Sequence, residues 1–563
     1  MKNKRSSQWF QTPGYHGMAR RAWLRSEGFP ADVFDGKPVV GICNSWSELN
    51  NCNAHLREVA AAVKRGVLAA GGVPLEFPTI SLGEMFMLPT TMMFRNLMAM
   101  DVEESIRANP MDAVVLLCGC DKTTPAQLMG AASADIPAIV VPGGPMLAGT
   151  FHGQKLGSGT DGRKLFDLYR TGRLTDEEWS EVEGCIARTS GHCTVMGTAS
   201  TMTSLAEALG MTLPGCANIP APDSRRLAIA ELSGRAAVEL IEKGLTPSRI
   251  MTREAFENAI TVLMALGGST NAVVHLIAIA GRVGIRLDLD DFDRIARQTP
   301  CIANVKPSGE YLMEDLFHAG GVPAVMNRIA GLLHAGCVTV NGKTIGENIA
   351  AARSGNDAVI RTLQRPLSSE GGIAALHGNL APDGAVIKVT AASPELLRHR
   401  GRAYVFETRD QMTAEIDRKD LPVDRDTVLV MRNCGPKGAP GFPEWGHIPM
   451  PRKLLQQGVT DMVRISDARM SGTSFGTVVL HVAPESAVGG PLAVVQTGDE
   501  IVLDVPARKL ELAVRDEEIQ RRLAGFSRPR PQYDRGYGRL FLDHVTQANL
   551  GCDFDFLMPE ARK

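Results

Sequence analysis

The first two thirds of the chain alternate short, uninterrupted apolar runs with stretches of helical pattern. Residues 38–43, 113–117 and 138–141 suit strands that are apolar on both faces, and residues 55–70 and 90–108 suit helices. Apolar strands that are separated by helices are typical of a parallel sheet with both faces covered. The pattern therefore predicts an α/β fold, with ligands bound beyond the carboxyl ends of the strands.

The pattern changes near Gly371, where short strand-like runs separated by Gly, Pro and Asp begin to dominate. These runs predict a β barrel or a β sandwich, and they cover residues 385–390, 403–407, 427–431, 462–465, 477–482 and 501–505. We place the domain boundary within residues 370–385, which gives domains 1–375 and 376–563. The tail from Arg508 onward, which includes a stretch rich in Pro and Arg, is interpreted as a surface arm or subunit contact.

Composition and charge exclude several classes of protein. The most apolar window, residues 259–280, is interrupted by residues 267–271 and by His275, so it predicts a buried helix with a functional Gly-rich break and not a membrane span. The 60 basic and 62 acidic side chains give a net charge of -2 without a basic run, which argues against a nucleic-acid partner. Eleven cysteines are too few for a disulfide scaffold, and no apolar segment follows the basic start. We therefore expect a cytoplasmic protein with reduced thiols.

Three cysteines stand in loops where strands or helices are expected to meet. Residues 118–125 read Cys-Gly-Cys-Asp-Lys-Thr-Thr-Pro directly after an apolar strand, and Cys52 and Cys193 lie in similar polar loops. Thiolate suits iron or zinc and carboxylate suits magnesium, so the adjacent Cys120 and Asp121 suggest two different metals close together. Ordinary buried or loop thiols remain the alternative at this point.

Two acidic residues and one serine loop are further candidates. Glu84 and Glu444 lie in Gly-rich loops, where each is either a ligand for a hard metal ion or a member of an ordinary surface ion pair. Residues 466–476 form a Ser/Gly turn after a predicted strand, which suits anion binding, a reactive Ser471, or simply a turn. Because the chain has no G-x-S-x-G elbow, an ordinary serine hydrolase is disfavoured.

Taken together, these motifs resemble one family, the dihydroxy-acid and sugar-acid dehydratases, which includes phosphogluconate dehydratase. The resemblance covers nearly the whole chain and rests on residues 52–53, 120–125, 191–193, 438–444 and 467–472. It implies an N-terminal α/β/α domain with a parallel sheet that holds an iron–sulfur cluster. It also implies a C-terminal β-barrel domain that closes over the cluster.

The resemblance also implies a set of site residues. The cysteine pattern is similar to the branch of the family with a 2Fe-2S cluster, and the implied cluster ligands are Cys52, Cys120 and Cys193. The implied ligands of Mg²⁺ are Glu84, Asp121, Glu444 and a carbamylated Lys122, in which carbamylation turns an ammonium into an oxygen donor. Ser471 is implied as the base that removes the C2 proton, and Thr473 as a residue that orients Ser471 or the substrate carboxylate.

The implied reaction is the dehydration of a 2,3-dihydroxy carboxylate to a 2-keto-3-deoxy acid. Residues 14–20, 196–202 and 466–469 resemble the sugar-acid branch, so we expect an aldonate such as arabinonate, xylonate or gluconate. The alternative is the dihydroxy-acid dehydratase of branched-chain amino-acid biosynthesis, which acts on 2,3-dihydroxyisovalerate. A remote alternative is an iron–sulfur sensor that binds RNA, against which the near-zero net charge counts. A homodimer or homotetramer is expected.

Overall fold

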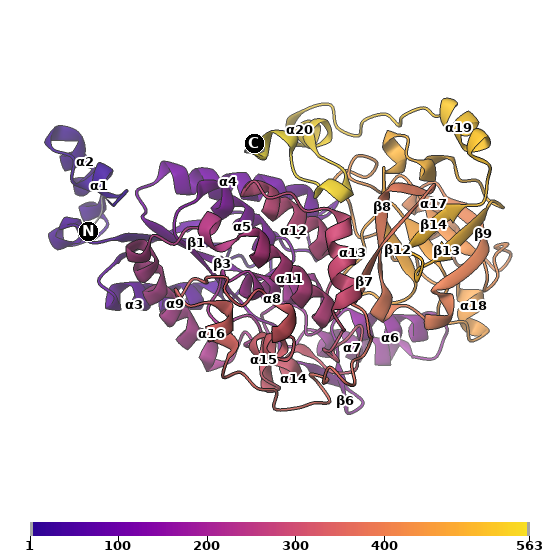
Figure 1. Ribbon diagram of the computed structural model, residues 1–563, viewed down its shortest axis with the longest axis horizontal. Coiled ribbons are helices and arrows are strands. Elements are labelled where there is room, and N and C mark those ends of the chain that lie inside the picture. Colours follow the sequence, from indigo (N-terminus) through magenta and orange to yellow (C-terminus); the bar gives the residue numbers. More distant parts are fainter. Residues whose placement is uncertain (1–3, 560–563) are drawn as a thin grey trace.

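The computed structural model describes residues 4–559, which form a sheet-and-helix domain followed by a barrel (Figure 1). The first domain contains a parallel sheet with strand order β2-β1-β3-β4. Three of these strands were predicted and are buried throughout, whereas the missed strand β2 begins with two buried residues and then alternates partly exposed with exposed residues. The strands are β1 (Val39–Asn44), β2 (Val73–Pro78), β3 (Ala113–Cys118) and β4 (Ala138–Pro142).

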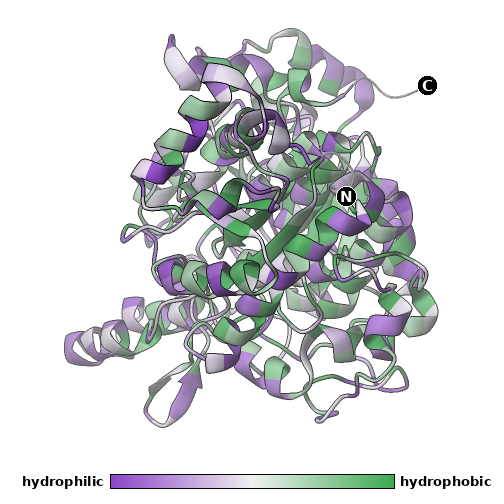
Figure 2. Ribbon diagram, turned by 90° about the vertical axis from the view of Figure 1, so that its left-hand side faces the viewer, coloured by the Kyte–Doolittle hydropathy of each residue, from purple (hydrophilic) through white to green (hydrophobic). Residues whose placement is uncertain are grey.

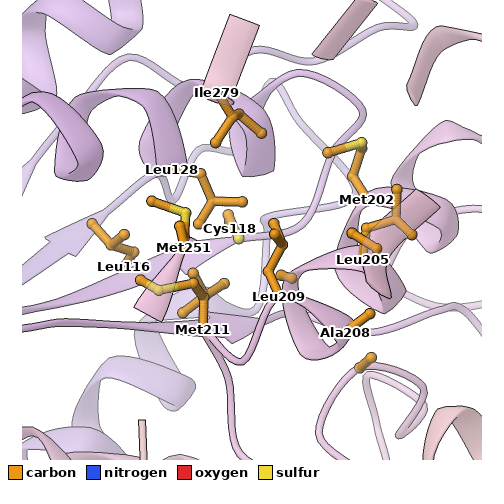
Figure 3. Close-up of a cluster of buried hydrophobic side chains, with 14 of the residues drawn as sticks. Leu116, Cys118, Leu128, Met202, Leu205, Ala208, Leu209, Met211, Met251 and Ile279 are labelled. Carbon is orange, nitrogen blue, oxygen red and sulfur yellow. The ribbon is translucent and has the colours of Figure 1, made fainter. Parts of the chain in front are cut away.

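Helices cover both sides of this sheet, as predicted. Figure 1 shows α4 (Arg95–Ala108) and α5 (Thr123–Ala134) above the sheet, and α3 (Leu56–Ala69) and α9 (Ser224–Lys243) below it. Figure 3 shows the packing at one point of this core, where side chains from β3, α5 and neighbouring helices meet. Figure 2 shows hydrophobic residues concentrated on the inner strands and helices, with hydrophilic residues toward the outside.

The most apolar window of the sequence forms two buried helices with a break between them, as predicted. Helix α11 (Arg253–Leu266) ends at Gly267, whose φ of +57° is the left-handed conformation that favours glycine, and α12 (Asn271–Arg282) begins four residues later. No helix within residues 4–559 is long and apolar enough to cross a membrane.

The second domain is a closed barrel of eight strands, which decides between the barrel and the sandwich. Its order is β10-β11-β12-β8-β7-β14-β13-β9. One hydrophobic cluster takes side chains from every strand, so the barrel has a packed interior. The strands are β7 (Ile373–Gly378), β8 (Ala381–Lys388), β9 (Arg398–Phe406), β10 (Val428–Met431), β11 (Arg464–Ser466), β12 (Val478–Ala483), β13 (Glu500–Asp504) and β14 (Lys509–Leu512).

The last part of the chain returns to the first domain, which corrects the prediction of a surface arm. Arg95 donates hydrogen bonds to the carbonyls of Gly551 (2.9 Å) and Cys552 (2.8 Å). Arg282 and Asp553 form a bidentate ion pair of 2.6 and 2.9 Å, and both side chains are fully buried. The Pro/Arg-rich segment, residues 527–531, is exposed as expected, but the residues after it tie the two domains together.

The remaining elements complete the layers. A short hairpin joins β5 (Gly149–Phe151) to β6 (Gln154–Leu156). The other helices are α1 (Ser7–Phe10), α2 (Gly14–Ser26), α6 (Thr160–Arg170), α7 (Asp176–Ile186), α8 (Thr198–Ala208), α10 (Pro247–Ile250), α13 (Leu289–Gln298), α14 (Met313–His318), α15 (Gly321–Arg328), α16 (Ile345–Ile349), α17 (Arg409–Glu415), α18 (Arg452–Gln456), α19 (Asp516–Ala524) and α20 (Gly536–His544). Helix α6 lies beside the barrel in Figure 1, at the contact between the domains.

The barrel contains one unusual buried charge, Lys388, at the end of β8. Its side chain is 1% exposed, and its Nζ has no hydrogen-bond partner within residues 4–559. Burial lowers the pKa of Lys388 from 10.5 to about 7. Between these two pKa values the unfolded chain binds one more proton than the folded chain, so the free energy of unfolding rises with pH from 7 to 10.5. The buried lysine therefore destabilises the folded state at low pH, and this cost is lost as the pH rises.

We expect Lys388→Met to remove this contribution. The variant should unfold at a higher temperature than the natural chain near pH 6.5, and the difference should shrink as the pH approaches 10. At low pH the variant's free energy of unfolding should exceed that of the natural chain by at most about 5 kcal/mol, at about 1.4 kcal/mol per pKa unit. Thermal unfolding followed by circular dichroism across this pH range measures it, with the exposed Lys509→Met as control. A difference that does not change with pH would contradict the prediction.

Candidate functional site

The site lies at the carboxyl ends of the first three strands of the parallel sheet. Cys52 lies in the loop after β1, Glu84 in the loop after β2, and Asp121 and Lys122 between β3 and α5. Because the carboxyl ends of parallel strands meet at one edge of a sheet, residues far apart in sequence come together there.

The three predicted cluster cysteines lie close together. The Cys120 thiol beside Cys52, together with burial, raises the pKa of Cys52 well above its ordinary value. Burial, together with the neighbouring Asp121 and Cys120, raises the pKa of the Cys193 thiol to about 12. Three loops therefore bring three thiols close together.

Close contacts between loops explain how the thiols meet. A Cβ on Gly119 would lie 2.6 Å from both Cys52 O and Asn53 Oδ1, so only glycine allows this approach. The Cys52 loop is tied to the Cys193 loop by a backbone hydrogen bond of 3.1 Å from Gly191 N to Asn51 O.

The predicted carboxylates converge on the predicted lysine. Lys122 is fully buried, and its Nζ lies 3.0 Å from Glu84 Oε2, 3.4 Å from Asp121 Oδ2 and 3.4 Å from Glu444 Oε1. Glu444 comes from the barrel domain, in the loop after β10, so this group of charges joins the two domains. Within residues 4–559, no three His, Cys, Asp or Glu side chains are already arranged as a metal site.

The carboxylates compete for few positive charges. Burial raises the pKa of Glu84 and of Asp121 despite the nearby Lys122. Burial acts in the same direction on Glu444, but the charges of Lys122 and Arg469 outweigh it and lower the pKa of Glu444 to about 2. The group therefore has an excess of buried acidic oxygen, which an added cation would neutralise.

Two residues that the sequence did not single out hold Glu444 in place. Asn271, the first residue of α12, donates hydrogen bonds to Glu444 Oε1 (2.8 Å) and Met470 O (3.2 Å). Arg469 donates to Glu444 Oε1 (2.9 Å) and to Phe442 O (2.7 Å). The Gly-rich break at residues 267–271 and the motif around Arg469 pointed to these segments, but not to these contacts.

The predicted serine lies in a loop that packs against the first domain. Ser471 Oγ and Thr473 Oγ1 are 3.0 Å apart, and Arg163 Nη1 donates a hydrogen bond of 2.6 Å to Thr473 Oγ1. A Cβ on Gly472 would lie 2.6 Å from Thr198 N and 2.7 Å from Ser269 Oγ, so the serine loop sits directly on the start of α8 and the Gly-rich break.

The other cysteines lie away from this group. Cys118 points into the apolar core (Figure 3) and accepts a hydrogen bond of 3.3 Å from Thr124. The remaining seven are buried, except for Cys185 and Cys337, which are partly exposed. A cavity of about 520 Å³ between the α12–α13 connection and the chain's last described residues contains none of the nine predicted site residues.

Known proteins match this chain over nearly its whole length. Residues 37–348 match the family described as dihydroxy-acid/6-phosphogluconate dehydratase N-terminal, and residues 358–552 match the corresponding C-terminal family. An L-arabinonate dehydratase of Rhizobium leguminosarum bv. trifolii (strain WSM2304) is 54% identical, over 98% of this chain and 96% of the relative. A 6-deoxy-6-sulfo-D-gluconate dehydratase of Pseudomonas putida is 50% identical, over 98% and 96%.

A more distant relative belongs to the other branch. A dihydroxy-acid dehydratase of Saccharolobus islandicus (strain L.S.2.15 / Lassen #1) is 41% identical, over 96% of this chain and 97% of the relative. Both family descriptions and all three relatives thus agree with the resemblance seen in the motifs. The chain belongs to the dihydroxy-acid/6-phosphogluconate dehydratase family.

Proposed function

We propose that this protein is a hydro-lyase that removes water from a sugar acid, a 2,3-dihydroxy carboxylate of the aldonate type, and forms a 2-keto-3-deoxy acid. The observation that carries the proposal is the convergence of three thiols, three carboxylates and a serine loop at the contact between the domains. In this proposal residues 1–375 hold the cluster and most of the Mg²⁺ ligands, and residues 376–563 carry the serine loop and contribute Glu444. The relatives named for sugar acids are 50–54% identical, which supports the sugar-acid branch.

The carboxylate group fits Mg²⁺, which prefers several oxygen ligands. We assign Glu84, Asp121, Glu444 and Lys122 as its ligands. The three carboxylates around Lys122 carry more negative charge than the positive charges of Lys122 and Arg469 can balance. An ammonium group has no lone pair to donate, so Lys122 can be a ligand only as the carbamate. Without a bound cation, the carboxylate oxygens around Nζ disfavour the negative charge of that carbamate. When bound, Mg²⁺ would spread the negative charge that grows on the substrate as the C2–H bond breaks.

The thiol group fits an iron–sulfur cluster, since thiolates are the usual ligands of such clusters. We assign Cys52, Cys120 and Cys193 to a 2Fe-2S cluster with one position free of protein ligands. When bound, such a cluster would act as a Lewis acid toward the C3 hydroxyl group. The raised pKa values of Cys52 and Cys193 mean that the thiols keep their protons until a metal replaces them.

The serine loop supplies the proton acceptor in this proposal. Thr473 Oγ1 accepts a hydrogen bond from Arg163, which leaves its own hydroxyl hydrogen free to point at Ser471 Oγ. This arrangement stabilises negative charge on the Ser471 oxygen. As the alkoxide, Ser471 takes the proton from C2, and the electrons of the C2–H bond form the C2=C3 double bond as hydroxide leaves C3. Transfer of the proton from Ser471 to that hydroxide gives water and restores the alkoxide, and the enol tautomerises to the 2-keto acid.

The second candidate is the dihydroxy-acid dehydratase of branched-chain amino-acid biosynthesis. The 41% identity to the Saccharolobus enzyme supports it, although less strongly than the higher identities support a sugar acid. The homodimer or homotetramer and the cytoplasmic location stay predictions.

The test of the proposal is anaerobic purification followed by counts of iron and sulfide and by a 2-keto-acid assay with Mg²⁺. The substrates are arabinonate, xylonate, gluconate and 2,3-dihydroxyisovalerate. We expect two irons per chain and faster turnover of an aldonate than of dihydroxyisovalerate. A colourless protein that stays inactive after cluster reconstitution would overturn the proposal.

Ser471→Ala should lower kcat at least about 1000-fold, because it removes the group that accepts the C2 proton. Visible absorbance and iron content should stay at natural levels, since Ser471 is not a cluster ligand. The exposed Ser527→Ala serves as the control and should keep full activity. If Ser471→Ala retains activity, the base is another group.

Cys193→Ser should lower the iron content and the visible absorbance of the purified protein, because the serine hydroxyl is a poor ligand for iron. The matched control is Cys185→Ser, which changes a cysteine outside the thiol group. Equal iron content in both variants would show that Cys193 does not bind the cluster.

Glu444→Gln should raise the Mg²⁺ concentration needed for half-maximal activity by about 10–100-fold, since it removes one negative charge while nearly keeping the side chain's shape. Titration of metal-stripped enzyme with Mg²⁺ measures this, and the exposed Glu395→Gln is the control. An unchanged Mg²⁺ requirement would remove Glu444 from the ligand set.

A further inference from the structure

A second cavity, of about 200 Å³, lies next to the serine loop between α6 and the barrel domain. It is joined to the site through Arg163, which lines the cavity and also donates the hydrogen bond to Thr473. Its walls include Arg163, Asp167, Arg170, His447, Arg464 and Phe475.

Three nitrogen atoms in this wall lack a partner. Arg170 Nε, Arg464 Nε and His447 Nδ1 are buried and make no hydrogen bond to any residue from 4 to 559. An unpaired buried polar group costs about 1–3 kcal/mol, so three of them in one cavity indicate a ligand.

Other atoms of the same side chains hold the arginines in place. Arg170 Nη2 donates a hydrogen bond of 2.7 Å to Met450 O, and Arg464 Nη1 donates one of 3.1 Å to Ile448 O. The arginine side chains are only 9% and 2% exposed. The unpaired nitrogens are therefore fixed by the fold before any ligand arrives, which is the condition for specific recognition.

The charge balance of the cavity favours a neutral ligand. Arg464 pairs with Asp461 at 2.7 Å, and Arg170 lies 3.6 Å from Asp167 and 3.8 Å from Asp417. The 3.6 Å separation between Arg170 and Asp167 is too long for a hydrogen bond, so the Asp167 carboxylate stays available to accept one from a ligand. Donors and acceptors together suit hydroxyl groups, which both accept and donate.

We propose that this cavity is the distal subsite of the enzyme, which binds the hydroxylated carbons of the aldonate beyond C3. The inference rests on the proposed function and extends it to the substrate's length. A 2,3-dihydroxy acid without oxygen beyond C3, such as dihydroxyisovalerate, gains no hydrogen bond there. The subsite therefore selects sugar acids over branched-chain dihydroxy acids.

The test is a series of 2,3-dihydroxy acids of increasing length: glycerate, threonate, arabinonate and gluconate. The holoenzyme, Arg170→Met and His447→Phe are compared by kcat/KM in the 2-keto-acid assay. Arg170→Met keeps the aliphatic stem, and His447→Phe removes the ring nitrogens without touching an ion pair. We expect kcat/KM of both variants to fall about 10–100-fold on the five- and six-carbon acids, which is the effect of losing one hydrogen bond to a charged or buried group. The loss should be smaller on the shorter acids. The exposed Arg418→Met is the control.

Several results would overturn the subsite. An equal loss at every length would mean that the residues act only on the structure, and no loss would mean that the cavity does not contact substrate. Faster turnover of 6-deoxy-6-sulfogluconate than of gluconate would assign the cavity to an anionic group instead of hydroxyls.

Failure of the proposed function is recognised separately, as the absence of turnover of any acid by the natural holoenzyme. In that case calorimetric binding of gluconate decides the question. Weaker binding to Arg170→Met than to the natural protein would support the subsite, and equal binding or none would overturn it.

Discussion

The rest of the site depends on the balance of charge around Lys122. Each buried ion loses hydration worth several kcal/mol, so three carboxylates are tolerated near one another only where positive charge lies among them. Lys122 and Arg469 supply that charge, and they draw Glu84 and Asp121 from the first domain and Glu444 from the barrel into one place. The same excess of acidic oxygen that makes the group costly without a cation supports the proposal that Mg²⁺ binds there.

Because this group joins two domains, the domains must be held in a fixed relation. Asn271 contacts Glu444 and Met470 at once, so it links the break between α11 and α12 to both barrel loops of the site. The end of the chain adds a second tie on another side, where Arg282 and Asp553 form a fully buried, bidentate pair. Removing either partner of such a pair would leave an uncompensated buried charge, so these contacts make the relative position of the domains rigid.

Much of the fold could be predicted from apolar runs, because β1, β3 and β4 are buried on both faces and read as continuous hydrophobic segments. Strand β2 was missed because its pattern alternates, and the packed tail was missed because its few buried residues follow an exposed Pro/Arg-rich stretch. The motifs indicated the candidate site residues, which the fold brings together. Contacts such as Asn271 with Glu444, 173 residues apart, and Arg163 with Thr473, 310 residues apart, exist only after folding.

The site and the distal cavity obey different physical constraints. In the group around Lys122, replacing any charged residue changes the balance of buried charge on which all the other charged residues depend. The cavity walls come from α6 and barrel loops, where Arg464 already has Asp461 as its partner and Arg170 lies near Asp167. If the cavity is the proposed subsite, substitutions at Arg170 or His447 change which groups face the substrate's tail without removing a charge around Lys122. Arg163 joins the two regions, since the side chain that lines the cavity also fixes the hydroxyl of Thr473 beside Ser471. The proposed subsite would therefore couple occupation of the cavity to the position of the proposed base, so that a substrate with the right tail aligns its reacting carbon with Ser471.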